Sequence, residues 1–246
     1  MVYIQSNKER TLPHHFDCAC AMYGAMDSAL DFRLTSFEEV SSGKLDHMIK
    51  SHLFVGSVEF MREVFKRIGI KDVRLPMNSD RPHELITLKE AQERVANGEN
   101  IFIKPIEIKL FTGLVLDGMQ YSSLKGLPDD TKIMAYKPFK EKILSEWRVY
   151  INNGKIIDSR NYSGDVTINL NYGWVNHKLS QLKDKNFPIA YTMDVAVFDS
   201  LPSVSPIYEG QAIVEFNDMW AIGNYGMPND LYLKLLKERY FEIIKT

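Results

Sequence analysis

Three side chains with oxygen donors belong to two short apolar segments in the C-terminal half of the chain. Asp194 lies in Tyr-Thr-Met-Asp-Val-Ala-Val-Phe, while Glu215 and Asn217 lie in Ala-Ile-Val-Glu-Phe-Asn. Turn-forming residues separate these runs, so the pattern predicts strand, loop, strand. Strand side chains alternate between two faces, which places Glu215 and Asn217 on one face, and Asp194 joins them if the strands are neighbours. Such oxygens are typical of a Mg²⁺ site at nucleotide phosphates; solvated strand-end residues are the alternative.

Basic residues come from segments earlier in the chain. Lys104 and Lys109 belong to an apolar run that we expect to form a strand over 101–113. Because burying an unpaired ammonium is costly, Lys104 should meet a counter-charge or lie at a cleft, unless it snorkels at a strand edge. Glu146 and Arg148 alternate with apolar residues, so their strand has one polar face, although a surface ion pair would show the same pattern.

Two further segments carry groups that suit a nucleotide or a carboxylate. Arg160 follows in the next predicted hairpin strand, and a guanidinium binds carboxylate or phosphate in a bidentate manner. The run Ile-Met-Ala-Tyr-Lys-Pro-Phe over 133–139 contains Ala135, Tyr136 and Lys137, whose backbone could read adenine from an edge-like strand. A plain strand that enters a turn at Pro138 is the other interpretation.

The order of these motifs resembles the ATP-grasp superfamily. The run Glu215-Phe-Asn-Asp-Met-Trp-Ala-Ile-Gly-Asn-Tyr-Gly226 is similar to the C-terminal signature of the clade named for its two arginines and one lysine. The resemblance implies an α+β ATP-grasp fold in which two α+β lobes clasp ATP, preceded by a small α/β domain. We therefore expect an N-terminal domain over 1–80 and an ATP-grasp domain over 81–246.

The same resemblance assigns roles to the candidate residues. It implies catalytic arginines that act on phosphate or carboxylate, a set of nucleotide contacts, and a Mg²⁺ site. The catalytic arginines are Arg148 and Arg160. The nucleotide contacts are Lys104, Lys109, Ala135, Tyr136, Lys137 and Glu146. The Mg²⁺ site consists of Asp194, Glu215 and Asn217.

The implied activity is that of an ATP- and Mg²⁺-dependent ligase, which joins a carboxylate to an amine through an acyl phosphate. The substrate would be a small molecule or a peptide that carries the carboxylate or the nucleophile. A phosphotransferase that uses the same nucleotide site is one alternative, and a nucleotide-binding module without turnover is another. The segment from Asn169 to Pro188 carries no recognised motif and is a candidate for acceptor specificity.

Composition limits the classes of partner. A formal net charge of −2 without a basic run gives no electrostatic footprint for nucleic acid. We find no signal peptide and no apolar run long enough to span a membrane, so we expect a cytoplasmic protein of undetermined oligomeric state.

Cys18 and Cys20 are too few to staple the fold, and with His14, His15 and Asp17 they lack a second ligand pair at zinc-finger spacing.

Periodicity predicts the elements that position these groups. A short strand at 53–55 leads into a helix capped by Ser57 and ended by Gly69, and a second helix is expected over 87–97. Further strands are predicted at 2–4, 71–76, 133–139 and 147–151, with hairpin turns at 117–118 and at Asn152-Asn153-Gly154. Helical patterns are also expected at 18–30 and from about Asp230 to the end.

Overall fold

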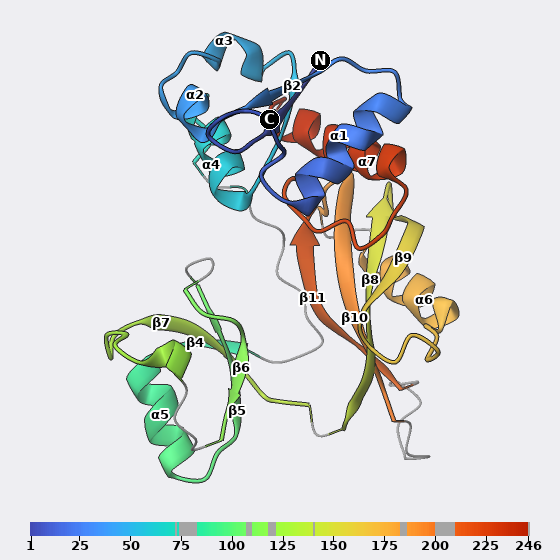
Figure 1. Ribbon diagram of the computed structural model, residues 1–246. Coiled ribbons are helices and arrows are strands. Elements are labelled where there is room, and N and C mark those ends of the chain that lie inside the picture. The colour runs from blue at the N-terminus through green and yellow to red at the C-terminus, as the bar shows by residue number, and fades with distance from the viewer. Residues whose placement is uncertain are drawn as a thin grey trace. The chain divides into compact units, whose positions relative to one another are not determined.

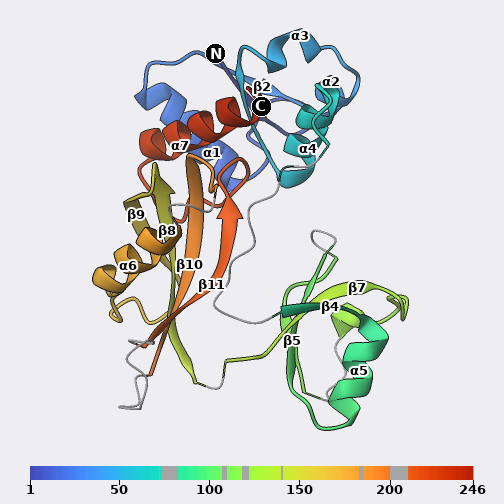
Figure 2. The same ribbon diagram turned by 180° about the vertical axis from the view of Figure 1, so that it is seen from behind.

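The computed structural model describes residues 1–71, 73, 83–106, 110–117, 122–139, 141–182, 186–199 and 210–245. The chain forms two compact units: Met1–Asn78 with Ile143–Thr246, and Ser79–Lys142. Both units combine helices with sheets, as the two ribbon views show for each unit (Figures 1 and 2). This confirms the expected α+β class. The domain boundary predicted near residue 80 lies outside the described residues, as does most of the strand predicted over 71–76.

The N-terminal part of the larger unit is a three-stranded parallel sheet with its helices. The central strand β1 (Val2–Gln5) pairs with β2 (Phe32–Thr35) on one side and β3 (Leu53–Val55) on the other. Parallel neighbours need crossover connections, and the intervening helices supply them. These helices are α1 (Phe16–Asp27), α2 (Phe37–Ser41) and α3 (Asp46–Ile49), and α4 (Val58–Arg67) follows β3. Sequence periodicity missed β2, α2 and α3.

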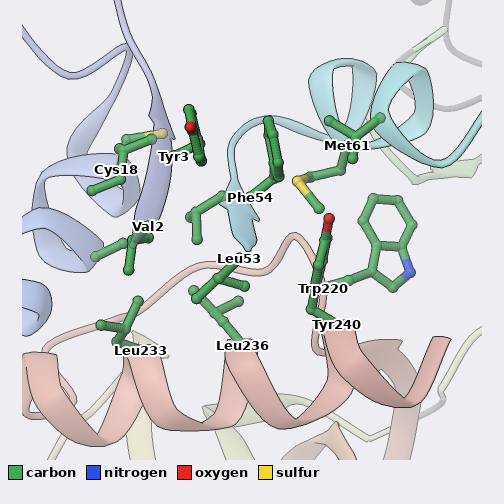
Figure 3. Packing of buried hydrophobic residues seen from close by; sticks show 14 of the residues in the cluster. Val2, Tyr3, Cys18, Leu53, Phe54, Met61, Trp220, Leu233, Leu236 and Tyr240 are labelled. Carbon is green, nitrogen blue, oxygen red and sulfur yellow. The ribbon is translucent and has the colours of Figure 1, made fainter. Parts of the chain in front are cut away.

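The last helix, α7 (Asn229–Ile243), completes the core of this N-terminal sheet. Figure 3 shows Leu233 and Leu236 of α7 beneath Val2 of β1 and Leu53 of β3. All four side chains are at most 3% exposed. Residues from opposite ends of the chain therefore share one apolar core, and removing α7 would uncover the sheet.

The second sheet of the larger unit is antiparallel, with the order β11-β10-β8-β9. Its hairpin turn has Asn153 and Gly154 at φ 49° and 70°, which confirms the tight turn that these residues predict. One face packs against α6 (Tyr172–Leu182), a helix that the sequence analysis did not recognise. The strands are β8 (Ile143–Asn152), β9 (Lys155–Gly164), β10 (Ala190–Phe198) and β11 (Gln211–Asp218).

The smaller unit has one antiparallel sheet with the order β4-β7-β5-β6, packed on helix α5. The prediction of a single strand over 101–113 was wrong, because β5 ends at Pro105 and the chain returns as β6, which pairs with β5. The hairpin connection between these strands consequently precedes β6, whereas Gly118 of the turn expected at 117–118 lies outside the described residues. The elements are β4 (His83–Thr87), α5 (Leu88–Ala96), β5 (Ile101–Pro105), β6 (Leu114–Leu116), a short 3₁₀ helix (Ser122–Leu124) and β7 (Lys132–Tyr136).

The N-terminal cysteines are packing residues. The Nδ1 atom of His15 accepts a hydrogen bond from the backbone N–H of Cys18 at the start of α1. Burial raises the pKa of the Cys18 thiol to about 12, which keeps it protonated at neutral pH. Within the described part of the chain, no three His, Cys, Asp or Glu side chains form a metal-holding group. None of the helices described there is long and apolar enough to cross a membrane.

We predict that Leu236→Ala lowers the free energy of unfolding of the larger unit by about 2–5 kcal/mol, since it leaves a cavity beneath the β1–β3 sheet. Urea unfolding followed by circular dichroism measures the change. Lys237→Ala, at the exposed neighbouring position of α7, is the control and should change stability by less than about 0.5 kcal/mol. Equal midpoints for the two variants would contradict the packing of α7 on the N-terminal sheet.

Candidate active site

Four charged residues form one row across the second sheet of the larger unit. The strand register pairs Glu215 of β11 with Asp194 of β10, Asp194 with Arg148 of β8, and Arg148 with Arg160 of β9. Side chains opposite one another in neighbouring strands point to the same face. The row therefore carries two carboxylates followed by two guanidinium groups, on the face opposite α6. Asp194 and Glu215 are neighbours, as the sequence predicts.

The centre of the row is the ion pair between Arg148 and Asp194. The Nε and Nη2 atoms of Arg148 donate to the two carboxylate oxygens of Asp194 at 2.8 and 2.7 Å, a bidentate geometry. The side chains are only 7% and 1% exposed. Burial alone would lower the pKa of Arg148, but the hydrogen bonds and charge of Asp194 outweigh it and raise that pKa. Arg148 is thus a fixed positive charge at every working pH.

Asn217 links the two carboxylates of the row. Its Nδ2 atom lies 3.2 Å from Oδ2 of Asp194 and 3.4 Å from Oε1 of Glu215. The amide N–H₂ group thus occupies the place where the carboxylates favour positive charge. Glu215 and Asn217 are half-buried, so this end of the row is more open than the Arg148–Asp194 pair. The structure brings together all three residues proposed for the metal site.

These donors fit a magnesium ion. Mg²⁺ usually takes one or two carboxylates from the protein and completes its shell with water and substrate phosphates. Glu215 and Asp194 supply two carboxylates. Asn217 supplies an amide, and a flip of this side-chain amide would present its oxygen in place of its N–H₂ group. Because Asp194 already accepts from Arg148 and Asn217, metal binding there requires it to share these hydrogen bonds.

The remaining polar residues predicted for this sheet lie on the same face. Arg160 donates from Nε and Nη2 to Oδ2 of Asp158 at 2.9 and 2.7 Å, and its side chain is 35% exposed. Glu146 is two residues before Arg148 on β8 and is half-buried. Arg160 is therefore held less tightly than Arg148 and is accessible to a ligand.

Aromatic residues that the sequence analysis missed cover Arg148. The rings of Tyr162 and Tyr225 stack with centroids 5.3 Å apart, and the Cζ atom of Arg148 lies 4.8 Å from the centroid of Tyr225. Burial raises the pKa of Tyr162, which keeps its phenol neutral. Tyr162 follows Arg160 by two residues, so strand alternation alone could have placed it on this face.

Tyr225 belongs to the segment 219–228, which we call the 219–228 loop. Before it, β11 extends through Asp218, which accepts two hydrogen bonds of 2.7 Å from Arg239 of α7. Asp218 does point away from Glu215 and Asn217, as alternation predicts.

The predicted nucleotide contacts of the smaller unit lie near the ends of β5 and β7. Lys104 is half-buried, with Nζ 5.8 Å from the centroid of the Phe102 ring. A Cβ atom at Gly113 would lie 3.0 Å from Cγ of Lys104, so glycine makes room for the lysine stem. Tyr136 lies beside Phe102, with ring centroids 6.0 Å apart. Lys109 lies outside the described residues.

The adenine-reading segment differs from the expected edge-like strand. β7 is an inner strand, in which Ala135 pairs with Glu84 of β4 and with Ile103 of β5. Ala135 is 2% exposed, so an edge-type contact from its backbone does not fit this sheet. Tyr136 is likewise paired on both sides, with His83 of β4 and Phe102 of β5. Lys137 and Pro138 follow the end of β7, and the prediction of a backbone contact remains for them.

We predict that Asp194→Asn destabilises the larger unit by about 3–5 kcal/mol, because it leaves the buried guanidinium of Arg148 without its counter-charge. Chemical denaturation of the variant measures this loss. The matched control is Asp158→Asn at the more exposed Arg160 pair, with an expected loss below about 1 kcal/mol. A loss for Asp194→Asn no larger than that control would show that the ion pair does not organise the sheet.

Structural comparison finds ATP-grasp proteins. The ATP-grasp ligase PsnB, complexed with a phosphomimetic variant of minimal precursor, Mg and ADP, matches with a TM-score of 0.51 at 11% identity, over 97% of each chain. The RimK domain protein ATP-grasp from Sphaerobacter thermophilus DSM 20745 gives 0.50 at 8% identity, over 97% of this chain and 98% of that chain. N5-carboxyaminoimidazole synthetase from Staphylococcus aureus complexed with ADP gives 0.50 at 8% identity, over 97% and 77%.

At such low identities these likenesses establish the ATP-grasp fold alone, and no curated protein matches the chain by sequence. The model of an ATP-grasp domain family, family 2 of the clade named for two arginines and one lysine, matches residues 79–235, more than half of the chain. That span contains the Arg148–Asp194 row and the strand with Lys104. The match confirms the resemblance drawn from the motifs, and the chain belongs to this second ATP-grasp family of the two-arginine, one-lysine clade.

Proposed function

We propose that this chain is an ATP- and Mg²⁺-dependent ligase that joins a carboxylate to an amine through an acyl phosphate. The observation that carries the proposal is the row of two carboxylates and two guanidinium groups on one sheet face. Cation-binding and anion-binding groups lie side by side there, as transfer of a metal-bound phosphoryl group to a carboxylate requires. Membership of an ATP-grasp family supports ATP as the phosphoryl donor.

Two steps follow from this chemistry. An oxygen of the substrate carboxylate attacks the γ-phosphorus of ATP, the bond to the β,γ-bridging oxygen breaks, and ADP leaves. The amine nitrogen then attacks the acyl carbon and loses a proton, and inorganic phosphate leaves with the former carboxylate oxygen. A carboxylate is a poor electrophile, and phosphorylation supplies the leaving group it lacks.

The residues of the chain bind and orient in this scheme. Arg148 stabilises negative charge on the transferred phosphoryl group with a guanidinium that Asp194 holds in one orientation. Arg160, more exposed, binds the substrate carboxylate, and Lys104 binds ATP phosphates. Glu215 and Asn217, together with Asp194, would hold Mg²⁺, which offsets phosphate charge when bound.

The substrate class proposed is a small molecule or a peptide with a carboxylate or an amine. The PsnB structure that matches this fold is complexed with a phosphomimetic variant of minimal precursor, Mg and ADP, and we take amino acids and short peptides as the first set to test.

Hydroxylamine trapping tests the proposed reaction directly. We predict that the full chain with MgATP, pooled amino acids and short peptides, and hydroxylamine forms a hydroxamate together with ADP and phosphate, because hydroxylamine intercepts an acyl phosphate. Mass spectrometry identifies the product, and EDTA provides the control without metal. A stable phosphorylated acceptor without hydroxamate would indicate a phosphotransferase, and absence of ADP would indicate a binding module; either result contradicts the ligase.

We predict that Glu215→Gln lowers MgATP turnover by at least about 100-fold while the melting temperature stays native. The substitution keeps shape and hydrogen-bonding capacity at a half-buried site but removes a charge that the metal needs. The matched control is Glu93→Gln on the exposed face of α5, which should keep full turnover. Full Mg²⁺-dependent turnover by Glu215→Gln would remove this residue from the site.

A further inference from the structure

Asn224 uses both its backbone and its side chain to hold the 219–228 loop in one conformation. It is 1% exposed, and its backbone N–H donates to Oδ1 of Asp17 in α1 at 2.8 Å. The hydroxyl of Tyr150 donates to a pair of neighbouring carbonyls, that of Asn224 at 2.8 Å and that of Gly223 at 2.7 Å. The Asn224 side chain accepts from the N–H of Gly226 at 2.7 Å and donates to the carbonyl of Met227 at 3.0 Å. Hydrogen bonds from two distant elements, α1 and β8, thus meet at this residue.

The next residue, Tyr225, has an unusual backbone conformation that these bonds maintain. Its φ is 49°, in the left-handed region that bulky residues rarely adopt. Such conformations are energetically unfavourable and persist where the surroundings enforce them, often at functional sites. In this conformation the Tyr225 ring lies over Arg148 and stacks on Tyr162.

Two sets of contacts orient Arg148: its hydrogen bonds to Asp194, and the rings of Tyr225 and Tyr162. Within the described residues, its hydrogen bonds use Nε and Nη2, and both go to Asp194. The rings of Tyr225 and Tyr162 lie 4.8 and 5.7 Å from its Cζ atom. The Asp194 pair fixes one edge of the guanidinium, and the rings restrict its rotation out of that plane. Nη1 takes no part in the pair with Asp194.

We propose that Asp17 is a positioning residue of the ligase site, because it anchors Asn224 and thereby holds Tyr225 against Arg148. The inference rests on the proposed function for the role of Arg148, while the anchor itself is read from the hydrogen bonds. Asp17 lies 207 positions before Asn224, so the N-terminal helix α1 takes part in organising the phosphate-binding arginine. The sequence motifs assign Asp17 no role in the reaction.

A structural role for Asp17 makes a different prediction. Asp17 lies in the first turn of α1, where a negative charge favours the helix, and 3.8 Å from Nδ1 of His15. If charge were its contribution, Asp17→Asn and Asp17→Ala would behave alike. If the hydrogen bond to Asn224 is its contribution, Asp17→Asn retains an acceptor oxygen and rescues the function that Asp17→Ala loses.

The experiment compares Asp17→Ala, Asp17→Asn and the control Asp27→Ala, which removes a carboxylate from the exposed far end of α1. Backbone amide hydrogen exchange of residues 219–228 and MgATP turnover are measured on the full chain. We expect Asp17→Ala to exchange faster in the loop and to lose about tenfold in kcat, with little change in KM for ATP. Asp17→Asn should keep at least about half of the turnover, and Asp27→Ala should resemble the unmodified chain.

A double-mutant cycle with Tyr225→Ala separates positioning from general destabilisation. If Asp17 acts through Tyr225, Asp17→Ala causes little further loss of kcat in the Tyr225→Ala background. Additive losses, equal effects of Asp17→Ala and Asp17→Asn, or unchanged loop exchange would each overturn the inference. Hydrogen exchange and ATP turnover report on the anchor whether or not a hydroxamate forms, so failure of the ligase proposal is distinguishable from failure of this one.

Discussion

The buried ion pair between Arg148 and Asp194 is the constraint on which the polar face of the larger unit depends. Removing two charges from water costs several kcal/mol, and only the bidentate geometry with its added hydrogen bond from Asn217 offsets that cost. An apolar pair of similar volume could stabilise a sheet equally well, so we interpret the pair as a device for orientation. It holds a guanidinium at a fixed angle beside the carboxylates of Asp194 and Glu215, where phosphoryl transfer would need it.

The larger unit keeps this orientation by joining the two ends of the chain. Helix α7 packs beneath the N-terminal parallel sheet, and its Arg239 pairs with Asp218 at the end of β11. The 219–228 loop connects β11 with α7 and is tied to α1 through Asp17. The N-terminal residues and the polar sheet face are consequently parts of one packed unit, and changes in α1 can reach Arg148 without touching a ligand.

Local periodicity predicted the parts of the site that lie within one strand or one tight turn. Alternation placed Glu215 with Asn217 and Glu146 with Arg148, and Asn153-Gly154 identified the hairpin between β8 and β9. Pairing between distant strands was beyond this reasoning. That Arg148 faces Asp194 follows from β8 lying beside β10, and the inner position of β7 follows from β4, which the sequence analysis did not recognise. The bond from Asn224 to Asp17 spans most of the chain and carries no local pattern.

In the reaction that we propose, a substrate carboxylate attacks ATP beside Arg148 and leaves its oxygen on phosphate. Incubating the full chain with MgATP and a pool of amino acids and short peptides labelled with ¹⁸O in their carboxylates tests that transfer in one measurement. Mass spectrometry of the released phosphate should show one ¹⁸O atom, because the carbon–oxygen bond of the acyl phosphate breaks when the amine attacks. Phosphate without ¹⁸O, released with ADP at the same rate, would show that water is the acceptor and would contradict the ligase.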